Sequence, residues 1–210
     1  MARWQPNASE RLALAALELF AERGYENTTV IDIAQRAGLT KSTFFRHFRD
    51  KREVLFGGDA MARLLAGAII AAPAAAAPLE AVAQALDAAG REIFTPARRD
   101  FTARRRAVVA AHPDLQEREA LKGLGLTAAM TGALRRRGVP GLTSCVAAEL
   151  GTLALKIAYE RWTGTAGGSD FGEVARAALS EVQSVAGQAQ PPDEPPAGRA
   201  RDRQGTPPGS

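Results

Sequence analysis

Residues 29–48 read TVIDIAQRAGLTKSTFFRHF, and this stretch decides the fold that we expect around it. Its apolar positions recur at helical spacing, first over 30–37 and again over 40–48. Gly38 separates the two segments, and glycine readily adopts the left-handed conformation that often follows a helix. Two short helices joined by a glycine-containing turn are typical of a helix-turn-helix motif.

Hydroxyl side chains stand where helix caps are needed. Thr29 precedes the first of these helices and Asp32 follows three residues later, which is a variant of the capping box. Thr40 precedes the second helix and can cap it in the same way. The sequence therefore predicts both helix starts.

The rest of the chain is predicted to be helical as well. A helix over about 8–23, capped by Asn7 or Ser9, precedes the motif, and a long helix is expected from about Asp50, broken or hinged at 57–58. Further helices are predicted over 78–94, 96–112 and 113–137, around 146–157, and from 171 onward. No stretch alternates as a β-strand would, so we expect an all-α fold of about nine helices.

Composition narrows the class of protein. Of 210 residues, 46% are hydrophobic and 24% are charged, which is typical of a globular chain. Aromatic residues make up only 6%, and alanine dominates the apolar content, which favours closely packed helices over a β-sandwich. The net charge is +4, and the basic excess is concentrated over 41–52. This asymmetry favours a polyanionic partner, although a solvated basic face would give the same counts.

The chain offers little for catalysis or for membrane insertion. Its single cysteine, Cys145, allows no internal disulfide, and its histidines, His47 and His112, do not stand in a metal-ligand spacing. We therefore expect no enzymatic activity, no cofactor and no metal. The sequence has no run of about 18 uninterrupted apolar residues, and its first residues lack the apolar core of a signal peptide. We expect a cytoplasmic protein that does not associate with a membrane.

The segment over 40–48 carries side chains suited to DNA. Its first turn holds Thr40, Lys41, Ser42 and Thr43, which are small or flexible polar residues. The first turn of a helix in the major groove can meet base edges, and its free N–H groups favour phosphate. We therefore expect double-stranded DNA as a partner.

Around this motif the chain resembles the DNA-binding domain of the TetR/AcrR family of transcriptional regulators. The likeness runs without a gap from Arg11 to Phe56, over RLALAALELFAERGYENTTVIDIAQRAGLTKSTFFRHFRDKREVLF. Its landmarks are Phe20, Gly24, Thr28, Thr29, Ile33, Ala34, Ala37, Gly38, Phe44, His47, Phe48 and Lys51. The resemblance implies a homodimeric DNA-binding protein, usually a repressor, that a ligand releases from its operator.

The resemblance also implies which residues contact the operator. They are Thr29, Thr40, Lys41, Ser42, Thr43, Phe45, Arg46, His47 and Lys51. Phe45 departs from the family pattern, in which tyrosine is common, and it lacks the hydroxyl that would reach a phosphate. Its ring is expected to stack or to contact a thymine methyl group. His47 has an alternative role as a packed structural residue, whereas Phe44 and Phe48 are expected to lie in the core.

The C-terminal part shows a second resemblance. The stretches RRRAVVAAHPDLQEREALKGLGLTAAMTGALRRRGVP over 104–140 and AAELGTLALKIAYERW over 147–162 are similar to a branch of TetR-type regulators that includes the mycofactocin-system regulator. That branch implies an acyl-CoA-like effector, for whose phosphates Arg98, Arg99 and residues 104–106 supply cations.

Apolar residues of these helices are the candidates for an effector pocket and for a dimer interface. The pocket candidates are Phe94, Phe101, Val108, Leu126, Met130 and Tyr159, with plain core packing as the alternative for each. The interface candidates are Val146, Leu150, Leu153, Ile157, Val174, Ala178, Leu179 and Val182, with packing inside one protomer as the alternative. In a dimer, two reading helices about 34–36 Å apart would reach successive major grooves.

We therefore expect three regions. They are a helix-turn-helix DNA-binding domain over 1–55, a helical ligand-binding and dimerisation domain over 56–187, and a disordered tail over 188–210, where proline, glycine and charged residues prevail. The expected function is a ligand-responsive, sequence-specific regulator, most simply a repressor with a small apolar or acyl-CoA-like effector. Two alternatives stay open: a non-inducible dimeric DNA-binding protein, and an enzyme or carrier with a vestigial DNA module.

Overall fold

The computed structural model describes residues 7–164 and 168–188, which fold into nine α-helices and two short 3-10 helices without a β-strand. The α-helices are α1 (Ala8–Arg23), α2 (Val30–Arg36), α3 (Lys41–His47), α4 (Ala60–Ala71), α5 (Pro78–Glu92), α6 (Arg99–Ala111), α7 (Pro113–Arg136), α8 (Gly141–Gly164) and α9 (Phe171–Gln188). The 3-10 helices are η1 (Arg52–Leu55) and η2 (Pro96–Arg98). The predicted helix over 96–112 is thus divided into η2 and α6. The expected all-α fold is confirmed, and residues 189–210 of the predicted tail lie outside the described residues.

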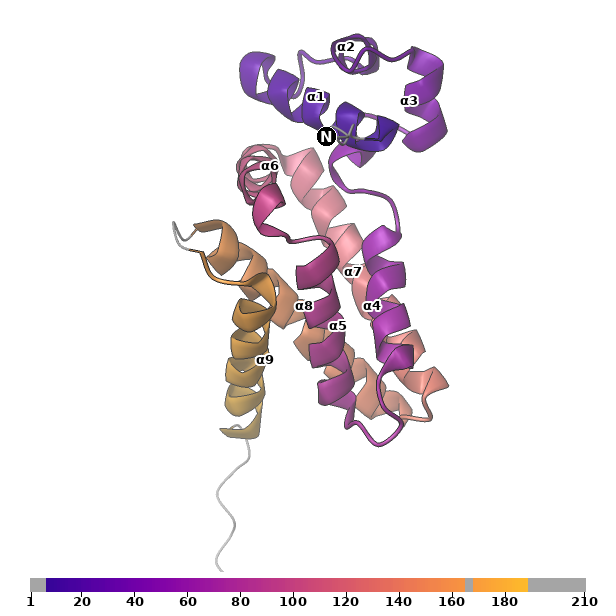
Figure 1. Ribbon diagram of the computed structural model, residues 1–210, viewed down its shortest axis with the longest axis vertical. Helices are drawn as coiled ribbons and strands as arrows, with labels where there is room; N and C mark the ends of the chain where they lie inside the picture. Colours follow the sequence, from indigo (N-terminus) through magenta and orange to yellow (C-terminus); the bar gives the residue numbers. More distant parts are fainter. Residues whose placement is uncertain (1–6, 165–167, 189–210) are drawn as a thin grey trace, which may run out of the picture.

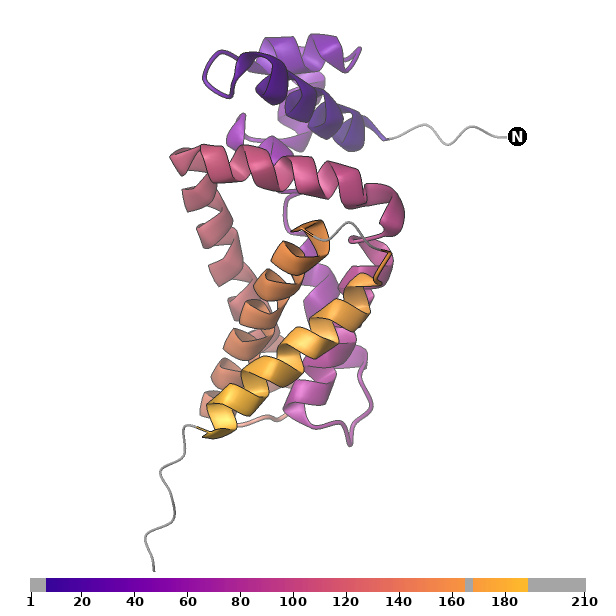
Figure 2. The same ribbon diagram turned by 90° about the vertical axis from the view of Figure 1, so that its left-hand side faces the viewer.

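The helices form two groups. The first three, α1, α2 and α3, gather at one end of the molecule, and α4, α5, α7, α8 and α9 form an elongated bundle (Figure 1). α6 lies crosswise between the two groups, as Figure 2 shows from the side. α8 packs against α9, and α4 packs against α5 and α7. The N-terminal group therefore sits on the bundle through α6 and the start of α7.

Side-chain caps fix the N-terminal helices as the sequence predicts. Asn7 caps α1, since its side chain accepts the backbone N–H of Glu10 at 3.0 Å. Thr29 caps α2, since its hydroxyl accepts the N–H of Asp32 at 3.2 Å. The carboxylate of Asp32 in turn accepts the N–H of Thr29 at 2.9 Å, which completes the capping box. The hydrogen bonds that fix these helix starts each join residues three positions apart in the sequence.

The segment after α3 differs from the predicted long helix. Asp50 accepts the backbone N–H groups of Arg52 at 2.8 Å and of Glu53 at 3.1 Å. The helix that follows it is only the short η1, which ends at Leu55. Gly57 and Gly58 follow with φ of +65° and +61°, outside any helix. Two successive left-handed residues cannot continue a right-handed helix, so of the two expectations, a break or a hinge at these glycines, the break is confirmed and the hinge within one helix is wrong.

Buried apolar side chains form two clusters. The N-terminal cluster lies among α1, α2, α3 and η1 and includes Leu12, Ile33 and Phe44. α6 and α7 add Val109 and Leu115 to it. The second cluster fills the bundle of α4, α5, α7, α8 and α9. Because two residues of the C-terminal part complete the N-terminal cluster, the two groups are packed together, and the boundary between residues 55 and 56 stays a prediction.

Small residues let α8 approach its neighbours closely. Five of its eight buried residues are alanine or glycine, namely Ala147, Ala148, Gly151, Ala154 and Ala158. A β-carbon at Gly151 would stand 2.5 Å from Cγ1 of Val82 in α5, so only glycine fits there without movement. α8 is the one helix of the described residues long and apolar enough to cross a membrane. In this structure it is an element of the bundle, with 39% of its most apolar window buried.

Candidate nucleic-acid interface

α3 buries one aromatic ring and exposes the residues around it. Phe44 is fully buried, and its ring lies 5.6 Å from that of Phe48, so the expectation that both belong to the core is confirmed. The exposed residues of α3 are Lys41, Ser42, Phe45, Arg46 and His47. Thr40 caps the helix as predicted, since its hydroxyl accepts the N–H of Thr43 at 3.1 Å. α3 lies in the group of helices at the end of the molecule (Figure 1).

The turn between α2 and α3 is held from α1. Gly38 has a φ of +64°, and the N–H of Leu39 donates to the carbonyl oxygen of Ala34 at 2.8 Å. The guanidinium of Arg11 donates to the carbonyl oxygen of Ala37, and a β-carbon at Gly38 would stand 3.0 Å from Nη2 of Arg11. Sequence reasoning missed Arg11, because its acceptor lies 26 residues away.

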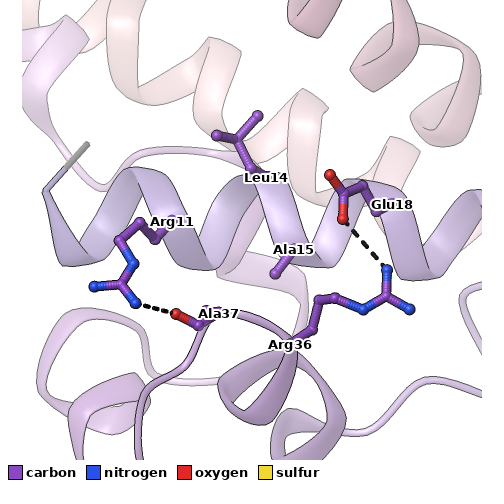
Figure 3. Close-up of a pocket in the computed structure, with 6 residues that line it drawn as sticks. All are labelled: Arg11, Leu14, Ala15, Glu18, Arg36 and Ala37. Atoms are coloured by element: carbon purple, nitrogen blue, oxygen red, sulfur yellow. Dashed lines mark hydrogen bonds and ion pairs between the residues drawn. The ribbon is translucent and has the colours of Figure 1, made fainter. Parts of the chain in front are cut away.

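A shallow pocket of about 190 Å³ lies between α1 and α2 (Figure 3). Its lining consists of Arg11, Leu14, Ala15, Glu18, Arg36 and Ala37. Arg36 lies 3.3 Å from Glu18 and binds both carboxylate oxygens of Glu22, at 2.9 and 2.7 Å. The hydrogen bond with Arg36 lowers the pKa of Glu22 and raises the pKa of the guanidinium. Because Arg36 binds the carboxylates of α1 and Arg11 of α1 binds the carbonyl oxygen of Ala37, these side chains hold α2 against α1.

Thr29 is occupied by its capping partner. Its hydroxyl donates to Oδ2 of Asp32 at 2.6 Å, and its backbone N–H donates to the same oxygen at 2.9 Å. These two hydrogen bonds lower the pKa of Asp32, and the one from the hydroxyl contributes more. A phosphate contact through Thr29 would therefore have to share a donor with Asp32, and it stays a prediction.

Lys51 is held by the segment that follows α1. Its Nζ donates to the carbonyl oxygen of Tyr25 at 2.6 Å and lies 4.0 Å from the centre of the Tyr25 ring. Burial raises the pKa of Tyr25 to about 12, so the phenol stays neutral. An ammonium has three donors, and a phosphate can accept those that Tyr25 leaves. The predicted contact is thus compatible with this arrangement but untested by it.

The six residues predicted for an effector pocket divide between the two clusters. Phe101 and Val108 of α6 pack against the N-terminal cluster. The other four, Phe94, Leu126, Met130 and Tyr159, belong to the bundle or pack against its core. Met130 is fully buried, and the ring of Phe94 stacks on that of Phe171 at 4.1 Å, as the core-packing alternative requires. Four of the six candidates thus belong with the bundle and two with the N-terminal cluster, and the effector pocket stays a prediction.

Arg105, one of the cations expected for an effector's phosphates, instead joins the two groups of helices. Its Nε donates to the carbonyl oxygen of Leu55 at 2.7 Å, and its guanidinium lies 4.8 Å from the centre of the Phe56 ring. Its Nη1 donates to the hydroxyl of Tyr159 at 2.8 Å and to Glu119 at 3.0 Å. One guanidinium thus connects η1 with α7 and α8.

Glu53 provides a second connection that sequence reasoning missed. It is 8% exposed, and its carboxylate pairs with Arg118 and, at 3.5 Å, with Lys122 of α7. Nζ of Lys122 also donates to the carbonyl oxygen of Gly58 at 3.0 Å. Arg118 lies 65 residues downstream of Glu53 in the sequence, so no local pattern signals the pairing.

The residues predicted for the dimer interface differ in exposure. Ala178, Leu179 and Val182 of α9 are 0%, 5% and 9% exposed, so they pack inside the protomer. Leu150, Ile157 and Val174 are half-buried. Val146 and Leu153 of α8 are 49% and 46% exposed and remain available to a second subunit.

Comparison with known proteins finds a family match in the N-terminal part. Residues 13–56 match the model of the bacterial regulatory proteins of the tetR family. The chain is 41% identical over 80 residues to the HTH-type transcriptional regulator TcmR of Streptomyces glaucescens, which is 38% of this chain and 35% of TcmR. It is 37% identical over 46 residues to the uncharacterized HTH-type transcriptional regulator YerO of Bacillus subtilis, 22% of this chain and 16% of YerO. These matches span about a third or less of the curated relatives.

Solved structures resemble the chain over most of its length. A protein from Syntrophomonas wolfei described as TetR-family gives a TM-score of 0.55 at 18% identity, over 85% of this chain and 94% of that one. NalD of Pseudomonas aeruginosa, described as the secondary repressor of the MexAB-OprM multidrug efflux pump, gives 0.54 at 20% identity, over 84% and 95%. At these identities the likeness concerns the fold. The helix-turn-helix geometry around Gly38 lies within the stretch, residues 13–56, that matches the tetR family of bacterial regulatory proteins.

Proposed function

We propose that this protein is a transcriptional regulator that binds a DNA operator as a homodimer and represses transcription from it. The exposed face of α3 carries the proposal, because Lys41, Ser42 and Arg46 lie outward while Phe44 anchors the helix from beneath. A short helix with a polar first turn fits the major groove. The match of residues 13–56 to the tetR family of regulatory proteins supports the same role.

The proposed DNA contacts differ in kind. Lys41 and Arg46 supply positive charge for phosphates or for guanine edges. The hydroxyls of Thr40 and Thr43 lie 3.0 Å apart and would turn from each other toward the DNA. Phe45, at 49% exposed, has no hydroxyl for a phosphate, so its ring would contact a thymine methyl group.

The effector that we propose is a small apolar or acyl-CoA-like molecule bound among the C-terminal helices. The support is the resemblance of 104–140 and 147–162 to that branch of the family. Effector binding would reach α3 through the connections of Arg105 and Glu53, which tie η1 to the bundle. Coupling between two binding sites is reciprocal, so operator DNA would weaken effector binding by the same factor. The protein would act in the cytoplasm.

The first test is fluorescence anisotropy with DNA from upstream of the protein's own gene, against a scrambled duplex, over a salt series. A preference of about a thousandfold or more at physiological salt, with two or more protomers per site, is expected of a specific dimeric regulator. Weak binding to both duplexes that disappears with salt would overturn the proposal for this operator, since only a basic surface would remain.

Variants identify the face that binds. Lys41→Ala and Arg46→Ala should each weaken operator binding at least tenfold. Each removes a DNA contact expected to contribute about 1.4 kcal/mol or more to the binding free energy, and 1.4 kcal/mol corresponds to a factor of ten. Arg136→Ala removes the same charge from the exposed end of α7 and should leave the affinity unchanged. An equal loss in all three variants would mean that net charge, rather than α3, determines binding.

A series of acyl-CoA thioesters of increasing chain length, with the free fatty acids as controls, tests the effector. Saturable release of the operator by one class supports the ligand-responsive regulator. Specific DNA binding that no member of either series alters would favour the non-inducible dimer.

A further inference from the structure

Tyr25 is a buried aromatic residue in the loop between α1 and α2. It is 3% exposed and belongs to the N-terminal cluster. The ring of Phe20 lies 5.1 Å from its ring and edge-on, and the ring of His112 lies 5.3 Å away. Phe20 belongs to α1, whereas His112 stands at the corner between α6 and α7. The ring of Tyr25 is therefore held from both groups of helices.

Lys51 lies over the ring that these contacts fix. Its Nζ is 4.0 Å from the centre of the Tyr25 ring and donates to the carbonyl oxygen of the same residue at 2.6 Å. Burial raises the pKa of Tyr25 to about 12, so the ring is a neutral phenol that attracts the ammonium through its π-face. A lysine ammonium sits on a flexible four-carbon stem. Two contacts with one buried residue restrict this stem to a defined position.

This position leaves the ammonium of Lys51 able to bind an anion. An ammonium has three N–H donors, and the carbonyl oxygen of Tyr25 accepts only one of them. Lys51 is half-buried and comes three residues after Phe48, at which α3 ends. The remaining donors therefore lie beside the helix for which we propose the major groove.

We propose that Tyr25 is a positioning residue for DNA binding, whose ring and carbonyl group hold the ammonium of Lys51 where it contacts a backbone phosphate. His112 holds the ring from the side of the bundle. A side chain that is already ordered loses less conformational freedom on binding, so the positioned ammonium binds the phosphate more tightly than a free lysine would. The inference rests on the proposed DNA binding and names the residues that prepare one of its contacts.

A double-mutant cycle tests the dependence of Lys51 on the ring. Tyr25→Leu removes the ring but keeps the backbone carbonyl group, and it should weaken binding to the upstream duplex at least about fivefold. Tyr25→Phe restores the ring and should recover most of this affinity. Lys51→Ala should weaken binding at least about tenfold in the wild type but less than about threefold in the Tyr25→Leu background, where the contact is already largely lost. Fluorescence anisotropy measures the four affinities of the cycle.

The salt dependence separates a lost phosphate contact from a damaged fold. The logarithm of the binding constant falls with that of the salt concentration by about 0.9 per neutralised phosphate, so Lys51→Ala in both protomers should reduce the slope by about 1.8. Tyr25→Leu should reduce the slope by at least about half as much. Leu115→Ala removes a fully buried side chain from the same cluster, so it should lower the melting temperature without changing the slope. Circular dichroism checks that every variant is folded at the assay temperature.

His112→Ala tests the contribution from the bundle. It should weaken binding about threefold when Lys51 is present and have no effect in the Lys51→Ala background, because it acts through the ring of Tyr25. Gln116→Ala, on the exposed first turn of α7, is the neutral control and should leave the affinity unchanged.

The outcomes distinguish this inference from the proposed function. Phosphate contacts carry no sequence information, so the change in slope should also appear on the scrambled duplex. A wild type without preference for the upstream duplex would overturn the proposed regulator, while the slopes on scrambled DNA would still decide the role of Tyr25. An unchanged slope in Tyr25→Leu, or an equal effect of Lys51→Ala in both backgrounds, would overturn the positioning role. Tighter binding by Tyr25→Leu would overturn it as well, since the ring would then withhold Lys51 from DNA.

Discussion

α3 and α8 show two ways in which a helix acquires a specific face. α3 has seven residues, a hydroxyl cap and one buried anchor, Phe44, and its exposed side chains project from that anchor. α8 has 24 residues and buries mostly alanine and glycine where it meets α5, so its position depends on how closely α5 can approach it. A few neighbouring residues thus decide which side of α3 is buried and which is exposed. The position of α8 is decided by the fit between helices distant in sequence.

The largest expected effect concerns the anchor of α3. Phe44→Ala removes a fully buried ring from the N-terminal cluster and should lower the free energy of unfolding by about 3–5 kcal/mol. Phe45→Ala removes the next ring, which is half-exposed, and should cost less than about 1 kcal/mol. Guanidinium denaturation followed by circular dichroism measures both. Similar losses in the two variants would show that α3 is not divided into a buried and an exposed side as described.

A smaller effect is expected where α8 touches α5. Gly151→Ala would place a β-carbon 2.5 Å from Cγ1 of Val82 and should destabilise the protein by about 1–3 kcal/mol through overpacking. Val82→Ala removes that methyl group, so adding it to Gly151→Ala should recover part of the loss. Thermal unfolding of the two single variants and the double variant gives the interaction energy. Purely additive losses would mean that the contact does not limit the approach of the helices.

The same contrast explains what the sequence could predict. The caps at Asn7, Thr29 and Thr40 were foreseen because each hydrogen bond closes within three residues. The sequence left open whether the helix breaks or hinges at Gly57 and Gly58, because a glycine pair is compatible with both, and only the path of the chain decides. Long-range contacts were missed, since nothing near a basic residue announces an acceptor many residues away.

The effector pocket and the dimer face show the same limit from the functional side. An apolar periodicity indicates that Phe94, Met130 and Ala178 face something apolar, but it does not distinguish a core from a pocket or a partner. In the structure the candidates differ in burial. That burial results from packing between helices that are distant in the sequence, so no single segment could reveal it. The exposed face of α3 was easier to foresee, because helix phase alone separates Phe44 from its polar neighbours.

Arg105 joins the two regions, and its removal should have an intermediate effect. Arg105→Met keeps an apolar stem but leaves the carbonyl oxygen of Leu55 and the hydroxyl of Tyr159 without this donor, which should cost about 1–2 kcal/mol. The matched control is Arg104→Met. Arg104 pairs with Asp100 at 3.7 Å on an exposed helix face, so its replacement should lower the free energy of unfolding by less than about 0.5 kcal/mol. Differential scanning calorimetry compares the three proteins. Equal melting temperatures for both variants would contradict the role of Arg105 as a connection.

The smallest expected effect lies in the capping box of α2 and appears as a pH dependence. Hydrogen bonds from Thr29 lower the pKa of Asp32 in the folded state, whereas an aspartate in the unfolded chain titrates near pH 3.9. The ionised carboxylate therefore stabilises the fold above about pH 4, and this contribution is lost as the pH falls through the folded-state pKa. Asp32→Asn should be less stable than the wild type at neutral pH, and the difference in free energy of unfolding should shrink with acidification.

Thr29→Val separates the hydroxyl from the rest of the capping box. It removes the hydroxyl hydrogen bond that contributes most to the lowered pKa of Asp32 while leaving the backbone N–H of residue 29 in place. In the Thr29→Val background, Asp32→Asn should therefore show a weaker pH dependence than in the wild type. Urea unfolding of the four proteins between about pH 3 and pH 7 measures this, a range that spans the titration of an aspartate. A stability difference between wild type and Asp32→Asn that stays constant over the range would show that the cap is formed by geometry alone, with no contribution from the charge of Asp32.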